Sequence, residues 1–129
     1  MENSKPGKIE NFQKETTRSI GNKAEDTAAE YLLSKGYRII CRQYRLKMGE
    51  IDIIAQDNDG TLAFVEVKSS FGSGFGNPLF RITPSKQKTI AKIARIYLTN
   101  HKISGVPCRF DIISVTNEKI EHLRNAFYA

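Results

Sequence analysis

Two apolar segments joined by a turn sequence constrain the fold of this chain more than any other feature. Residues 50–56 and 62–68 are rich in Ile, Ala, Leu, Phe and Val, and the turn sequence DNDG at positions 57–60 separates them. Apolar runs of this length, interrupted by Asp, Asn and Gly, are typical of an antiparallel β-hairpin. The sequence therefore predicts two adjacent strands that lie in the core of the domain.

The length of the hairpin loop decides which side chains meet across the two strands. A three-residue loop with Gly60 in the left-handed conformation pairs Asp57 with Thr61, and hence Asp52 with Glu66. A loop of two or four residues would put these two carboxylates on opposite faces of the sheet. Gly60 favours the three-residue loop, and in the first strand Asp52 is expected to alternate with the apolar residues on either side.

The remaining pattern predicts a single mixed α/β domain. Residues 1–19 are almost without apolar side chains and are expected to form a flexible tail, which leaves residues 20–129 as one domain. The order α-β-β-β-α-β-β favours one mixed sheet flanked by helices. The other expected elements are a helix over 22–35 ended by Gly36, a strand over 37–44, a Gly- and Phe-rich loop over 71–80, a helix from Thr83-Pro84 to Asn100, and strands over 109–115 and 119–123.

Length and composition narrow the class of protein. A chain of 129 residues suits one domain with a single core. Its apolar runs fall well short of the roughly 20 residues that a membrane helix needs, so no membrane is expected. The polar N-terminal residues do not resemble a secretory signal. Cys41 and Cys108 are too few for a disulfide scaffold, and a cytoplasmic protein with reduced thiols is predicted.

The positive charge of the chain is concentrated in one region. The sequence has 20 basic and 14 acidic residues, yet residues 69–110 contain seven basic residues and no acidic one. Residues 31–49 form a second stretch without acids. Single-sign stretches favour a polyanionic partner such as nucleic acid. The alternative is a basic surface that only keeps the protein soluble.

Charged residues interrupt the second apolar strand. The two-residue period puts Glu66 and Lys68 on the same face as Leu62 and Phe64. If Asp52 lies opposite Glu66, two carboxylates about 5 Å apart repel each other by about 3 kcal/mol at an effective dielectric constant near 20. Lys68 would offset part of this repulsion, and a divalent cation would offset more.

Two carboxylates, a backbone carbonyl and water molecules make a site suited to Mg²⁺ or Mn²⁺. Beside such a metal, Lys68 could orient or deprotonate a water, or stabilise charge that develops on a phosphate. Two structural alternatives remain: a buried Lys–Glu pair, and strand ends that emerge into solvent.

The first predicted helix adds a further acid. Glu25 falls on the same helical face as Ala28, Ala29 and Leu32, and an acid in line with a core stripe needs a partner or a function. A first-turn acid stabilised by the helix dipole is the alternative.

The second predicted helix carries the basic residues. Lys88, Lys92 and Arg95 share one stripe, and with Lys86 they are spaced to meet a phosphate backbone. The loop over 71–80 offers Phe side chains for stacking on a base.

Taken together, these motifs resemble the YraN-like family of uncharacterised bacterial proteins, which is placed in the restriction-endonuclease-like, PD-(D/E)XK nuclease superfamily. The matching segments are GNKAEDTAAEYL (21–32), GYRI (36–39), GEIDIIA (49–55), FVEVK (64–68), FGNP (75–78), TPSKQ (83–87), RFD (109–111) and IEHLRNAF (120–127).

The resemblance implies a nuclease core similar to that of archaeal Holliday-junction resolvases. Asp52 and Glu66 would be the metal ligands together with the backbone carbonyl of Val67, Lys68 would be the catalytic lysine, and Glu25 would assist the metal or its water. The chain departs from the superfamily pattern at Ile51, where Pro is usual, and at residues 69–70, where many relatives carry Thr-Arg.

The sequence thus predicts a metal-dependent endonuclease that acts on DNA, in particular on branched or structured DNA. The rival hypothesis is a nucleic-acid-binding or adaptor protein that keeps the fold without turnover, and a nuclease that acts on RNA is a third possibility. The sequence leaves the oligomeric state open, with a homodimer as one option because resolvase-like nucleases often act as dimers.

Overall fold

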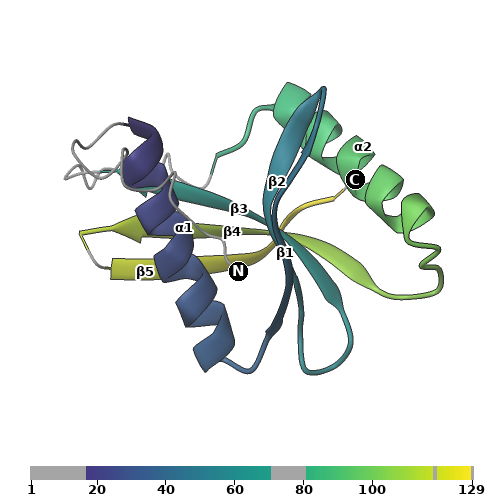
Figure 1. Cartoon of the computed structure of the whole chain (residues 1–129), viewed down its shortest axis with the longest axis horizontal. Coiled ribbons are helices and arrows are strands. Elements are labelled where there is room, and N and C mark those ends of the chain that lie inside the picture. The colour runs from purple at the N-terminus through teal and green to yellow at the C-terminus, as the bar shows by residue number, and fades with distance from the viewer. Residues whose placement is uncertain (1–16, 71–80, 118, 129) are drawn as a thin grey trace, which may run out of the picture.

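The computed structural model describes residues 17–70, 81–117 and 119–128, and it confirms the predicted order of elements (Figure 1). The helices and strands are α1 (Thr17–Ser34), β1 (Arg38–Leu46), β2 (Gly49–Gln56), β3 (Leu62–Ser70), α2 (Pro84–Asn100), β4 (Cys108–Thr116) and β5 (Lys119–Phe127).

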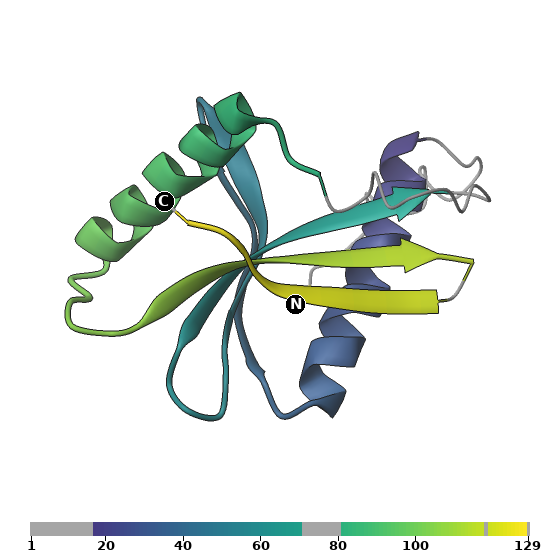
Figure 2. The same ribbon diagram turned by 180° about the vertical axis from the view of Figure 1, so that it is seen from behind.

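The strands form one mixed sheet in which spatial order follows chain order, β1-β2-β3-β4-β5. All neighbouring strands are antiparallel except β3 and β4, which are parallel and are connected through α2. A parallel pair requires such a crossover because the chain must return to the same end of the sheet. Figures 1 and 2 show α1 and α2 on opposite sides of the strongly twisted sheet.

Each helix closes a separate part of the core. The α2 side gathers Ile54, Phe64, Ile93, Tyr97 and Ile112, and the α1 side gathers Ala28, Leu32, Ile53, Val65 and Ile113. In α2, Ile90, Ile93, Ala94 and Tyr97 recur at helical spacing and are all buried. Thr83 caps this helix, and its side chain accepts a hydrogen bond from the backbone N–H of Lys86.

Two ends of elements differ from the sequence prediction by more than two residues. Helix α1 already begins at Thr17, so residues 17–19 belong to a helix and not to the expected tail. Strand β5 extends to Phe127 because the register shifts between Phe110 and Ile112, at Asn125 with a φ of 57°. Residues 1–16 and the predicted loop over 71–80 lie outside the described residues.

The β2–β3 turn has the predicted three-residue loop. Gly60 has a φ of 92°, and the N–H of Asp57 donates to the carbonyl of Thr61 over 2.9 Å. Strands β2 and β3 pair in one unbroken register that runs from Ile53 with Val65 toward the turn. Extended by one step beyond the last pair, this register would set Asp52 opposite Glu66, the arrangement that the turn chemistry predicts.

We expect Gly60→Ala to lower the free energy of unfolding by about 1–2 kcal/mol, because Ala in the left-handed region is strained. A Cβ at position 60 would meet no atom within 4 Å, so the loss is conformational and not steric. Gly105 has a φ of 75° and equally open surroundings, so Gly105→Ala should lose a similar amount of stability and serves as the positive control. Chemical denaturation measures both. Unchanged stability in Gly60→Ala would contradict the assigned turn.

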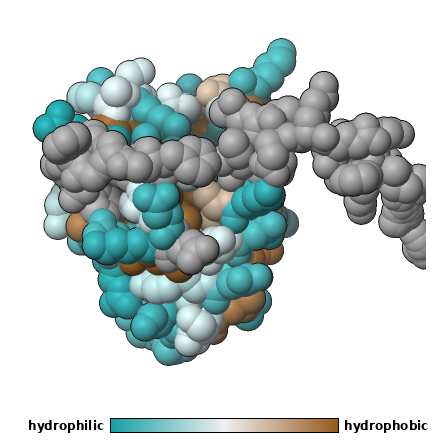
Figure 3. Space-filling view, turned by 90° about the vertical axis from the view of Figure 1, so that its left-hand side faces the viewer, coloured by the Kyte–Doolittle hydropathy of each residue, from teal (hydrophilic) through white to brown (hydrophobic). Residues whose placement is uncertain are grey.

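In the part of the chain that the structure describes, no helix has the length and apolarity needed to cross a bilayer. Figure 3 shows the side of the molecule where β3 ends, and hydrophilic residues make up most of its visible surface. The exposed large apolar side chains of Leu33, Met48 and Leu123 lie on α1, at the β1–β2 turn and on β5. Isolated residues of this kind are normal on a protein surface.

Candidate functional site

The site begins where the ladder between β2 and β3 stops. Its last pair toward the start of β2 is Ile53 with Val65, and a regular continuation would pair Ile51 with Val67. Instead, Oδ2 of Asp52 accepts a hydrogen bond from the backbone N–H of Val67 over 2.8 Å. Because the N–H and C=O of one strand residue point to the same side, the carbonyl of Val67 also faces the gap that opens beside β2.

The regular alternation expected along β2 is wrong at Asp52. Ile53 packs in the cluster on the α1 side, whereas Ile51 packs in the cluster on the α2 side, although residues two apart in a regular strand share a face. The β1–β2 register places Gln43 opposite Asp52, and Gln43 has a φ of 55°. The hairpin therefore turns over at this step, and a non-glycine residue in the left-handed region marks the place.

Glu66 is the second carboxylate of the site. It is only 8% exposed and lies on the α2 side of the sheet, near Phe64 and Ile90. Nζ of Lys86, in the first turn of α2, donates to Oε2 of Glu66 over 2.8 Å. Lys86, predicted from sequence as a contact for nucleic acid, is thus bound to one of the two carboxylates.

The carboxyl of Asp52 has a strongly raised pKa. Burial raises its pKa most, the charge of Glu66 adds to the effect, and the hydrogen bond from Val67 opposes it; the result is a pKa of about 7. Smaller contributions come from Glu25 and Glu50. Burial is thus the main cause of the raised pKa, and the neighbouring carboxylates add to it.

Glu25 is buried in line with the core face of α1, as predicted, and is 5% exposed. Its Oε1 accepts a hydrogen bond over 2.8 Å from Nε of Arg42 on β1, and Nη2 of the same guanidinium reaches Asp26 over 2.6 Å. The sequence pointed to a partner or a function for Glu25, but Arg42 was noticed only as one charge of an acid-free stretch. The pair clamps α1 to β1 beside Asp52.

Lys68 follows on β3, where alternation puts it on the face of Glu66. It is half-buried and pairs in the parallel ladder with Ser114 of β4. Within the described ranges its ammonium forms no ion pair, so it is not committed to either carboxylate.

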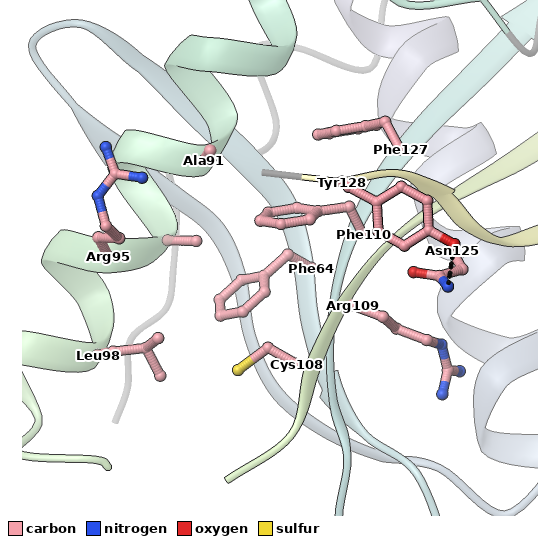
Figure 4. A pocket seen from close by; sticks show the side chains of 11 residues that line it. Phe64, Ala91, Arg95, Leu98, Cys108, Arg109, Phe110, Asn125, Phe127 and Tyr128 are labelled. Atoms are coloured by element: carbon pink, nitrogen blue, oxygen red, sulfur yellow. Dashed lines mark hydrogen bonds between the residues drawn. The ribbon is translucent and has the colours of Figure 1, made fainter. Parts of the chain in front are cut away.

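The other predicted nucleic-acid contacts lie along α2. Lys88, Lys92 and Arg95 are exposed, and Arg95 also borders a cavity of about 320 Å³ between α2 and strands β4 and β5. Figure 4 shows the rings of Phe64 and Phe110 at this cavity, while Lys86 and Glu66 are not among its lining residues. The cavity is mainly apolar and is separate from the carboxylates.

The donors at the site fit a hard cation. In residues 17–70, 81–117 and 119–128 no group of three or more His, Cys, Asp or Glu side chains is arranged as a metal site. Asp52 and Glu66 nevertheless supply two carboxylates, and the carbonyl of Val67 faces the same gap. Mg²⁺ usually keeps several waters and takes only one or two carboxylates, so this donor set suits Mg²⁺ or Mn²⁺.

A second charged cluster, which sequence reasoning missed, lies on the α1 side of the sheet. Asp111 of β4 is 1% exposed and accepts hydrogen bonds from Arg109, from Nε2 of His122 over 2.8 Å and from the N–H of Asn125 over 3.0 Å. In the sequence, Asp111 and His122 stand out only within the segments RFD and IEHLRNAF of the family resemblance.

Arg109 and His122 extend this cluster to other elements. The guanidinium of Arg109 reaches the hydroxyl of Tyr37 over 2.5 Å and Oδ2 of Asp57 over 3.2 Å. Nδ1 of His122 lies 3.1 Å from the hydroxyl of Tyr31 on α1. Each member has a hydrogen-bond partner, so the cluster stabilises the junction of α1, β4 and β5.

A family model and individual relatives of the chain point to the same protein family. The model of the uncharacterised protein family UPF0102 matches residues 24–115. A UPF0102 protein of Persephonella marina is 49% identical over 107 residues, which cover 83% of this chain and 91% of that protein. The UPF0102 protein STH1475 of Symbiobacterium thermophilum is 43% identical over 118 residues, covering 88% of this chain and 99% of that protein.

Proposed function

The chain belongs to the UPF0102 family, and we propose that it is a Mg²⁺- or Mn²⁺-dependent endonuclease that hydrolyses phosphodiester bonds in DNA, with branched or structured DNA as its substrate class. One observation supports the proposal: where the ladder between β2 and β3 stops, Asp52 is buried close enough to Glu66 for the charge of Glu66 to raise its pKa. A buried pair of like charges is costly unless a cation completes it.

The residues of the site divide the chemistry among them. Asp52, Glu66 and the carbonyl of Val67 hold the cation. A bound Mg²⁺ would supply positive charge to the phosphate and lower the pKa of an attacking water. Lys68, half-buried and not tied to a carboxylate, donates a hydrogen bond to a phosphate oxygen or to that water.

The charge distribution supports a nucleic-acid substrate. Lys88, Lys92 and Arg95 are exposed on α2, the helix whose first turn contacts Glu66 through Lys86. A phosphate backbone that follows this helix would bring a phosphodiester bond toward the carboxylates. Such contacts orient the substrate without reading its sequence.

The test is cleavage of linear duplex, single-stranded and four-way-junction DNA with Mg²⁺ or Mn²⁺. We expect Lys68→Met to reduce the cleavage rate by about 10²–10³-fold, because a charge aimed at the transition state is lost. Binding of DNA should stay nearly unchanged. Lys119→Met is the matched control, because that side chain is 73% exposed and pairs with Glu121 on β5.

Three results would redirect the proposal. DNA binding without cleavage by the wild type, with either metal, would favour the adaptor hypothesis. Selective cleavage of RNA would keep the chemistry and change the substrate. Binding that does not weaken steeply as salt rises would contradict a phosphate-backbone partner of any kind.

A further inference from the structure

Lys86 is the cation that the structure brings to the carboxylates. Its Nζ lies 2.8 Å from Oε2 of Glu66, and its side chain is 48% exposed whereas that of Glu66 is 9% exposed. The backbone at Lys86 is fixed, because its N–H is capped by Thr83 at the start of α2. The ammonium thus covers the buried carboxylate from the solvent side, at the end of a long side chain on a rigid support.

Lys86 brings one positive charge to the two carboxylates of the site. The charges of Asp52 and Glu50 also act on its ammonium, but Glu50 has its own partner, Nε of Arg45, at 2.8 Å. One ammonium thus acts on the two carboxylates of Glu66 and Asp52. A cation with two charges matches two carboxylates better than a single ammonium does.

We propose that Lys86 is an exchangeable counter-ion: a divalent cation displaces it from Glu66, and the released ammonium then binds a phosphate of the nucleic acid. The inference rests on the proposed function and names its regulation, since cation binding and substrate binding become coupled through one side chain. Exchange needs only rotation of side-chain bonds, because half of the side chain already contacts solvent. Lys88, Lys92 and Arg95 continue the phosphate-binding surface along the same helix.

The pair of Glu25 with Arg42 shows the contrasting arrangement. The planar guanidinium of Arg42 engages Glu25 and Asp26 at the same time, over 2.8 Å and 2.6 Å. Displacing it would break two charge-assisted hydrogen bonds, whereas displacing Lys86 breaks one. Arg42 therefore remains in place as a structural clamp, and Lys86 is the mobile charge of the site.

The first test measures binding of Mn²⁺ alone, by calorimetry, to the folded protein. We expect Lys86→Gln to bind Mn²⁺ about three- to tenfold more tightly than the wild type, because no partly exposed ion pair has to be broken first. Lys88→Gln removes the same charge from the same helix without a contact to Glu66, and it corrects for general electrostatics. Circular dichroism confirms that each variant is folded.

The outcomes separate the two proposals. If wild type and Lys86→Gln bind Mn²⁺ with equal affinity, or if the gain equals that of Lys88→Gln, exchange is wrong while the metal site stands. If neither protein binds Mn²⁺, the metal-dependent function fails and exchange fails with it.

The second test measures binding of a fluorescent DNA duplex with and without Ca²⁺, which oxygen donors also bind. Lys86→Gln should weaken DNA binding about threefold or more when Ca²⁺ is present and hardly at all when it is absent, because only the displaced ammonium reaches a phosphate. An equal loss in both conditions would show that Lys86 contacts DNA without leaving Glu66, and would overturn the exchange.

Discussion

Replacing Asp52 by Asn is expected to stabilise the metal-free protein and to abolish metal-dependent cleavage. The carboxyl of Asp52 has a pKa raised from 3.8 to about 7 by burial and by the charge of Glu66. This difference corresponds to about 4 kcal/mol in favour of the uncharged form. Asn has the same shape, carries no charge, and its carbonyl can still accept the N–H of Val67. We therefore expect about 2–4 kcal/mol of added stability at about pH 8.

The pH dependence of the wild type follows from the same residue. In the unfolded chain Asp52 titrates near its ordinary value, and in the folded protein it titrates at about 7. Between these values the folded state binds more protons, so stability falls as the pH rises from about 4 to about 7 and then levels off. In Asp52→Asn this part of the pH dependence disappears. Urea denaturation at several pH values measures both profiles.

If Asp52→Asn is more stable than the wild type and yet inactive, its loss of activity cannot come from a folding defect. Asp52→Asn removes the negative charge of one proposed metal ligand. The cleavage rate should therefore fall by at least about 10³-fold, which corresponds to several kcal/mol of transition-state stabilisation. Added Mg²⁺ should stabilise the wild type and not the variant. Glu30→Gln, which removes a charge from an exposed position of α1, is the control. A less stable Asp52→Asn protein would contradict the assigned electrostatics.

Asp111→Ala should produce the opposite result, a loss of about 3–5 kcal/mol in the free energy of unfolding. Burial alone would raise the pKa of Asp111, but hydrogen bonds from His122, Asn125 and Arg109 lower it below the ordinary value. The variant leaves the guanidinium of Arg109, only 14% exposed, without its main partner. Because the pKa of Asp111 is lowered in the folded protein, the stability that its ionised carboxylate contributes is complete above about pH 4. That contribution is lost as the pH falls further.

Two controls test the origin of that loss. Glu121→Ala breaks the exposed pair with Lys119 on β5 and should cost less than about 1 kcal/mol. The double variant Arg109→Met/Asp111→Leu removes both charges together and should be less destabilised than the sum of its single variants. If Asp111→Ala unfolds at the same urea concentration as Glu121→Ala, the cluster does not stabilise the fold.

Local sequence signals predicted the parts of the site that depend on neighbouring residues. Gly60 and the polar residues before it predicted the three-residue loop, and the loop length sets the register of the pairs from Gln56–Leu62 to Ile53–Val65, which lead up to Asp52 and Glu66. The face of α1 that carries Glu25 follows from the helical period, so its burial was also predictable. The order of elements was predictable for the same reason, since each helix and strand has its own period and end signals.

The rest of the site depends on how distant segments dock. Lys86 and Glu66 are 20 residues apart and meet only because α2 packs across the sheet, so Lys86 was predicted to contact nucleic acid alone. Arg42 reaches Glu25 from another strand. The left-handed backbone of Gln43, which turns the hairpin over at Asp52, has no counterpart in local propensity because glutamine rarely adopts it.

The order of the strands also concentrates the entropic cost of folding in one step. The pairs β1–β2, β2–β3 and β4–β5 are each closed by a short turn, whereas β3 meets β4 only after the chain has passed through α2. Closing that long loop is the most demanding contact of the sheet in conformational entropy. The two carboxylates belong to the locally closed meander of β1, β2 and β3, and the long closure is the one that brings α2, and with it Lys86, across the sheet. The site is therefore complete only when α2, the connection between the two parallel strands, has packed on the sheet.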